Sequence, residues 1–197
     1  MLFIHYVFVG LWLCAQIPAT QPASIPTLAD TAELFTAQAD KSQISYTLKH
    51  QLHLIKATAA QGIVGKAKVI GKRTIQVIMD ASVMFFDSHN ANRDQHMKEV
   101  VQAALYEHVI LKAQAILESP MAANNQAHFK GQLQFHGITR PIEFDARIDM
   151  KTEMDAHVLS DFSISLDAYQ IERPSLLFIK VDDKLDIHAD VVFKRQN

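Results

Sequence analysis

The sequence has a single cysteine, Cys14, and only six glycines and six prolines in 197 residues. A lone cysteine excludes an intramolecular disulfide, and so little glycine and proline excludes collagen-like and low-complexity chains. An excess of basic charge is also absent, because 19 lysines and arginines stand against 21 acidic residues. A general nucleic-acid binder needs a basic face to neutralise phosphates, so we expect no nucleic acid among the partners. The apolar content of 49% is normal for a globular protein.

Lysine and arginine are missing before Lys41, and the first 15 residues contain an apolar run, Leu2–Ala15 (LFIHYVFVGLWLCA). This run is too short to span a bilayer as an ordinary helix and is typical of a signal-peptide core. We predict a cleavable signal peptide over residues 1–19, with cleavage between 15 and 23. Residues 20–33 are predicted to be a proline-rich tether, and residues 34–197 the domain. An uncleaved segment that tethers the protein to a membrane is the alternative.

Most of the domain alternates apolar and polar residues with a period of two. The clearest stretches are 44–52, 74–79, 129–135, 142–149, 162–167 and 185–191. Such alternation is typical of strands with one buried and one solvated face. So many alternating strands, joined by short polar breaks, predict an all-β fold, an antiparallel sandwich or barrel.

One stretch, 92–105 (NRDQHMKEVVQAAL), does not alternate. Its apolar residues recur near helical spacing, and Asn90 or Asn92 can cap a helix that begins there. We therefore predict one short helix, which covers one end of the barrel.

Catalytic motifs are missing from the sequence. It contains no G-x-S-x-G, no H-E-x-x-H and no glycine-rich phosphate loop. His50 and His53 stand three apart, and if both lie on one strand they point to opposite faces, which disfavours a joint metal site. The acidic group around Asp183 lacks the spacing of a calcium loop. We expect no enzyme, no catalytic residue, no metal and no resident cofactor.

Arg93, Asp94 and His96 bring a cation, an anion and an imidazole into one predicted helical turn. They are compatible with a capped helix that carries a local Arg–Asp pair. The residues alone favour this interpretation over a polar cluster at the barrel mouth that holds a ligand head group. The second interpretation stays open.

Several stretches, taken in order, resemble the YceI-like family of polyisoprenoid-binding proteins that are exported to the bacterial periplasm. They are an opening strand at 44–50, a glycine-containing strand at 62–69, the R-D-x-H element at 93–96, and a final alternating strand at 184–194. The most specific is 131–142, which matches G-x-L-x-x-x-G-x-T-x-P-[VI]. The sequence departs from the family at His108, where a proline is usual, and over 168–175, which lacks the usual Asp-Phe-Gly.

The resemblance implies an antiparallel eight-stranded lipocalin-like barrel with an elongated apolar interior. It implies an isoprenoid or isoprenoid quinone as the ligand, and a periplasmic location. Head-group contacts are then predicted for Arg93, His96 and His50, with Asp94 orienting Arg93. Residues with inward parity are predicted to form the apolar lining: Tyr46, Leu48, Val77, Met79, Leu133, Phe135, Phe144, Phe162 and Ile164.

The leading hypothesis is an exported, non-catalytic protein that carries, stores or scavenges a long apolar lipid. A second hypothesis is a redox accessory or enzyme that uses a bound quinone-like cofactor, with His96 or His50 as the titrating group. A third is a filled barrel that serves as an interaction module at the cell envelope, with which the protein would associate loosely. Lipid identity, transport direction and oligomeric state stay open.

Overall fold

The computed structural model describes residues 32–176 and 179–196. The predicted signal peptide and residues 20–31 of the predicted tether lie outside these residues. The first strand begins at Ala32, so it includes the last two residues of the range 20–33.

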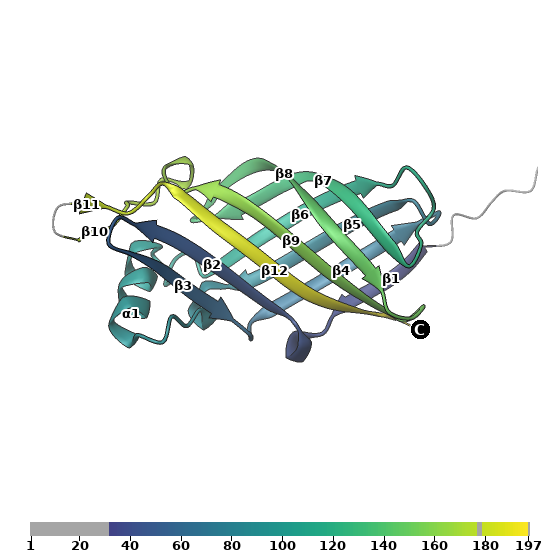
Figure 1. Ribbon diagram of the computed structural model, residues 1–197, viewed down its shortest axis with the longest axis horizontal. Helices are drawn as coiled ribbons and strands as arrows, with labels where there is room; N and C mark the ends of the chain where they lie inside the picture. The colour runs from purple at the N-terminus through teal and green to yellow at the C-terminus, as the bar shows by residue number, and fades with distance from the viewer. Residues whose placement is uncertain (1–31, 177–178, 197) are drawn as a thin grey trace, which may run out of the picture.

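The described chain is built almost entirely of strands (Figure 1). The first half contains β1 (Ala32–Ala37), β2 (Gln43–His50), β3 (His53–Ala59), β4 (Ile63–Ile70), β5 (Thr74–Ser82) and β6 (His108–Ile116). The second half contains β7 (Asn124–Phe135), β8 (Ile138–Met150), β9 (Asp155–Ser165), β10 (Ser175–Leu176), β11 (Ile179–Lys180) and β12 (Lys184–Arg195). The helical elements are η1 (Ala39–Lys41), η2 (Val83–Phe85), α1 (Ala91–Val100) and η3 (Asp167–Tyr169).

Eight strands close an antiparallel barrel in the order β1-β4-β5-β6-β7-β8-β9-β12, and β12 pairs back onto β1. This confirms the predicted fold class. The β2–β3 hairpin extends this wall, because β2 continues along the edge of β12 that β1 occupies further on. Among the described strands, β3 pairs with β2 alone. On its other side β3 meets the chain at a single isolated bridge, between Thr58 and Asp87. The barrel wall is therefore interrupted beside β3, at the end where α1 lies (Figure 1).

The predicted alternation matches the burial of the strands. Along β7, for example, Phe129, Leu133 and Phe135 are buried, and the residues between them are mostly exposed. The β7–β8 connection has only two residues, His136 and Gly137, both with positive φ. This is the type I′ geometry that suits the twist of a two-residue hairpin, and it explains the glycine of the family motif at this position.

Two local predictions are wrong. The stretch 44–52 is not one strand, because the chain turns at Gln51 and Leu52 and leaves Leu52 exposed. The helix predicted over 92–105 ends at Val100, and Gln102 adopts a left-handed φ of 49° that stops its continuation. Asn90 is the cap, since its side chain accepts a hydrogen bond from the Arg93 amide at 3.0 Å.

The more densely packed part of the core lies away from α1. Phe129 stacks on Phe144 with ring centroids 5.3 Å apart, and Phe162 packs against Phe144 at the same distance. The eight strands that close the barrel, and the buried hydrophobic side chains that they enclose, are found among the described residues 32–176 and 179–196. This range therefore contains a complete core and can fold as a unit.

Candidate functional site

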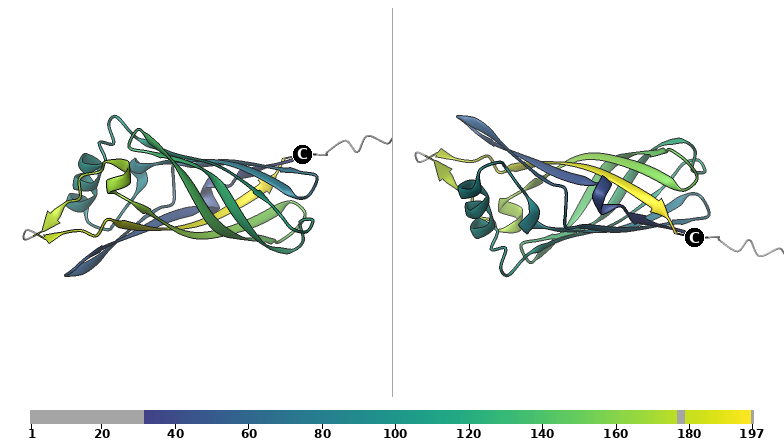
Figure 2. Two further views of the ribbon diagram at one scale, coloured as in Figure 1. Left: turned by 90° about the horizontal axis from the view of Figure 1, so that it is seen from above. Right: turned by 90° about the horizontal axis from the view of Figure 1, so that it is seen from below.

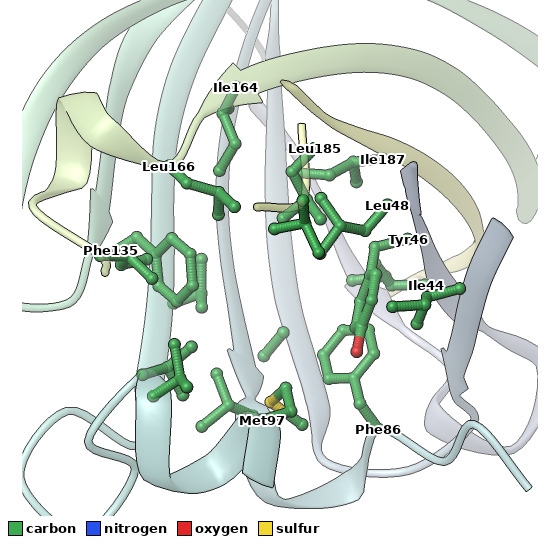
Figure 3. Close-up of a pocket in the computed structure, with 18 of the residues that line it drawn as sticks. Ile44, Tyr46, Leu48, Phe86, Met97, Phe135, Ile164, Leu166, Leu185 and Ile187 are labelled. Carbon is green, nitrogen blue, oxygen red and sulfur yellow. The ribbon is translucent and has the colours of Figure 1, made fainter. Parts of the chain in front are cut away.

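A cavity of about 510 Å³ occupies the half of the barrel next to α1. Its walls come from β2, β3, β5, β6, β7, β9, β12 and α1, and they are almost entirely apolar. Figure 3 shows aliphatic and aromatic side chains converging on this space, with the Tyr46 hydroxyl as the labelled oxygen among them. An apolar space of this size is suited to an apolar guest.

A second apolar cavity of about 100 Å³ lies deeper in the barrel. Both cavities are lined by Met79, Leu111, Phe162, Ala189 and Val191, so these side chains form the partition between them. The Phe129–Phe144 pair lines the deeper cavity. The interior thus has a wide outer chamber and a narrow inner one.

The predicted apolar lining divides between these two chambers. Tyr46, Leu48, Met79, Leu133, Phe135, Phe162 and Ile164 line the outer chamber. Val77 and Phe144 line the inner one. Contact of these side chains with a ligand stays a prediction.

The mouth of the outer chamber is the polar part of its lining. Asn92, Arg93 and His96 of α1 face it, together with His50 and His53 of the β2–β3 hairpin. Of the predicted head-group residues, Arg93, His96 and His50 therefore border the chamber, whereas Asp94 does not.

The expectation that His50 and His53 point to opposite faces is wrong. The turn between them makes them directly opposed partners of the hairpin, with ring centroids 5.2 Å apart. His50 is buried, accepts a hydrogen bond from the Leu52 amide at 3.3 Å, and lies 3.1 Å from the Ile179 carbonyl oxygen through Nε2. Its ring therefore ties the hairpin turn to β11.

Arg93 is held in place by Ser88. The Arg93 Nε donates to Ser88 Oγ at 2.8 Å, and Nη2 donates to the Ser88 carbonyl oxygen at 2.8 Å. Asp94 accepts hydrogen bonds from the Ser88 amide, at 3.0 Å, and from the Ser88 hydroxyl. Asp94 thus positions Arg93 through Ser88 rather than by direct contact. Among the described residues Arg93 Nη1 has no hydrogen-bond acceptor, which leaves it available to a guest.

The apolar surroundings of the chamber shift the pKa of the Tyr46 phenol. The pKa of Tyr46 is raised to about 12, mainly by burial and also by the nearby Asp94 charge, while the Arg93 charge opposes the shift. Its ring lies 5.4 Å from that of Phe86. The phenol therefore stays neutral against an apolar wall.

Sequence reasoning missed Ser88, Phe86 and His53. Ser88 is a buried small polar residue before the cap, where it follows no catalytic or binding motif. Phe86 stands outside any alternating stretch, so its inward direction had no periodic signal. The contribution of His53 depends on the hairpin turn, which the sequence does not mark with glycine or proline.

The family model of the YceI-like domain matches residues 35–193. The chain belongs to the YceI-like family. No curated protein matches the sequence. Among solved structures, Burkholderia cenocepacia BcnA is similar with a TM-score of 0.68 and 13% identity, covering 79% of this chain and 98% of that one.

A second similar structure is a polyisoprenoid binding domain from Saccharophagus degradans implicated in plant cell wall breakdown. Its TM-score is 0.65 at 10% identity, covering 82% of this chain and 98% of that domain. A Campylobacter jejuni YceI protein has a TM-score of 0.51 at 13% identity, covering 62% and 72%. At these identities the likeness concerns the fold.

Two further observations describe the same part of the chain. Within residues 32–176 and 179–196, no helix is long and apolar enough to cross a membrane. Over the same residues, no three His, Cys, Asp or Glu side chains gather as a metal site would require.

Proposed function

We propose that this YceI-like protein is an exported, non-catalytic carrier that holds an isoprenoid or similar long apolar lipid inside the barrel. The outer chamber carries this proposal, because it is large, apolar and open at one end. A polyisoprenoid-binding domain with the same fold supports the choice of guest. A filled barrel acting only as an interaction module would not need such a chamber.

The chamber matches a branched hydrocarbon chain. Removing apolar groups from water is favourable, so a prenyl tail gains affinity with every unit that enters. The polar end of the guest then lies at the mouth, where Arg93 offers Nη1 and His96 and His53 border the opening. A guanidinium is well suited to a phosphate or a polar ring.

Export accounts for the apolar N-terminal run. We propose that residues 1–19 are a signal peptide, that residues 20–31 form a tether ahead of the barrel, and that the protein acts in the periplasm. A lipid tail needs shielding while it crosses an aqueous compartment, and the chamber supplies it.

The test is binding of geranylgeraniol to residues 32–197. Binding is measured by how much of the fluorescent probe N-phenyl-1-naphthylamine the alcohol displaces from the protein. Leu133→Asp places a carboxylate in the chamber, and Ile44→Asp does so at a half-buried lining position if the first variant fails to fold. Both should abolish displacement. Ile78→Asp, on the exposed outer wall, should bind as the wild type does. Unchanged displacement in a folded lining variant would refute an interior site.

A further inference from the structure

The tip of the β2–β3 hairpin exposes two large apolar side chains. Leu52 is 61% exposed and Leu54 is 65% exposed. Figures 1 and 2 show this hairpin reaching outward at the α1 end of the barrel, next to β10 and β11. The inner side of the same tip carries His50 and His53, which border the chamber mouth. The exposed leucines are therefore continuous with the opening through which a guest enters.

The hairpin is also basic in a chain that is acidic as a whole. No acidic residue occurs between Asp40 and Asp80, whereas seven lysines and arginines do. Two of them, Lys49 and Lys56, are exposed on the hairpin, and Lys49 pairs directly across from Leu54. The neighbouring carboxylate of Asp186 on β12 is engaged by Lys184 Nζ at 2.8 Å and by Ser163 Oγ at 2.7 Å. The hydrogen bond from Lys184 lowers the pKa of the Asp186 carboxyl most, and the Lys49 charge also helps to lower it. Neither Lys49 nor Lys56 forms an ion pair among the described residues, so both ammonium groups remain available to an external anion.

Exposed leucines flanked by lysines match the surface of an anionic bilayer. Leucine side chains gain by entering the acyl boundary, and each lysine near an anionic surface raises partitioning about fivefold. A stable protein partner needs about 800 Å² on each side, whereas the large apolar side chains exposed at the tip are two leucines. Charge and size together favour a bilayer over a protein.

We propose that the β2–β3 tip docks this protein on an anionic lipid bilayer. Leu52 and Leu54 enter the membrane boundary, Lys49 and Lys56 contact lipid phosphates, and the chamber mouth faces the membrane. Docking would let the chamber take up its lipid guest directly from the bilayer. This part of the proposal rests on the proposed function.

The experiment is flotation of residues 32–197 with vesicles of phosphatidylethanolamine and phosphatidylglycerol in equal parts, and with pure phosphatidylcholine vesicles. The wild type should float with the anionic vesicles only. Leu52→Ser with Leu54→Ser should lower the partition coefficient at least tenfold, and Lys49→Gln with Lys56→Gln should do the same.

Matched control variants lie on the outer barrel wall, where β-branched apolar side chains and lysines are exposed. Val64→Ser with Ile78→Ser, and Lys66→Gln with Lys68→Gln, should leave flotation unchanged. The proposal is overturned if the wild type stays in solution or if the tip variants float as the wild type does. It is also overturned if the partition coefficient of the wall variants falls as far as that of the tip variants. Association through the tip into dimers without vesicle binding also overturns it.

Binding of geranylgeraniol added from ethanol, without vesicles, separates this proposal from the proposed function. The tip variants should bind it as tightly as the wild type, because they leave the chamber intact. Tip-dependent flotation without geranylgeraniol binding would refute the carrier function and leave docking in place. Geranylgeraniol binding without flotation would refute docking alone.

Discussion

The size of the outer chamber predicts how affinity depends on the length of a prenyl chain. An apolar cavity of about 150 Å³ accommodates benzene, or about 25 Å³ per carbon. At that density about 510 Å³ holds about 20 carbons, which is four isoprene units. At about 0.3 kcal/mol per atom, each five-carbon unit adds about 1.5 kcal/mol, or about tenfold in Kd.

The assay is probe displacement with geraniol, farnesol, geranylgeraniol and solanesol, which have two, three, four and nine isoprene units. We expect Kd to fall about tenfold per unit as far as geranylgeraniol and to change little beyond it. Phe162→Leu thins the partition to the inner chamber of about 100 Å³ and should extend the gain by about one unit. Equal affinity across the series, or a steady gain as far as solanesol, would refute the reasoning.

Substitutions at three other positions test the fold and the mouth. Gly131→Ala should cost more than about 2 kcal/mol in urea unfolding, because the new Cβ overlaps the Lys112 carbonyl of the adjacent strand; a smaller loss would contradict this packing. Asp94→Ala should cost about 3 kcal/mol and Asp94→Asn about 1 kcal/mol, since only the first removes the Oδ1 atom that accepts from both the Ser88 amide and the Ser88 hydroxyl; equal losses would argue against this arrangement. The pKa of Tyr46 in the folded protein lies above that of an unfolded tyrosine. The stability that the neutral phenol contributes is therefore complete below pH 10 and is lost as pH rises toward 12. The wild type should therefore lose about 3 kcal/mol more than Tyr46→Phe across that window, and parallel pH profiles would show that burial does not hold the phenol neutral.

The barrel could be predicted from the sequence because burial on one face imposes a period of two on every long strand. Leu133 and Phe135 illustrate this, since their parity alone placed them inside. The same reasoning failed at the β2–β3 turn. Gln51 and Leu52 are not typical turn residues, so the alternation seemed to continue through them and placed Leu52 on the wrong side.

The candidate site was harder to predict than the fold. Arg93 and His96 stood out because charged groups cluster in one helical turn, and both do border the chamber. Ser88 did not, because its role depends on the chain folding back so that one hydroxyl meets both Arg93 and Asp94. The alternation of inward and outward residues also could not distinguish the hollow half of the barrel from the more densely packed half. Side chains that line a cavity and side chains that fill a core recur with the same period.

The most direct test of a lipid-filled barrel is native mass spectrometry of the protein purified from the envelope of a bacterial host. We predict one added mass per chain that is released on denaturation and fragments as a prenyl lipid, and that is absent from Leu133→Asp. A guest-free mass that stays unchanged after incubation with geranylgeraniol would contradict the account.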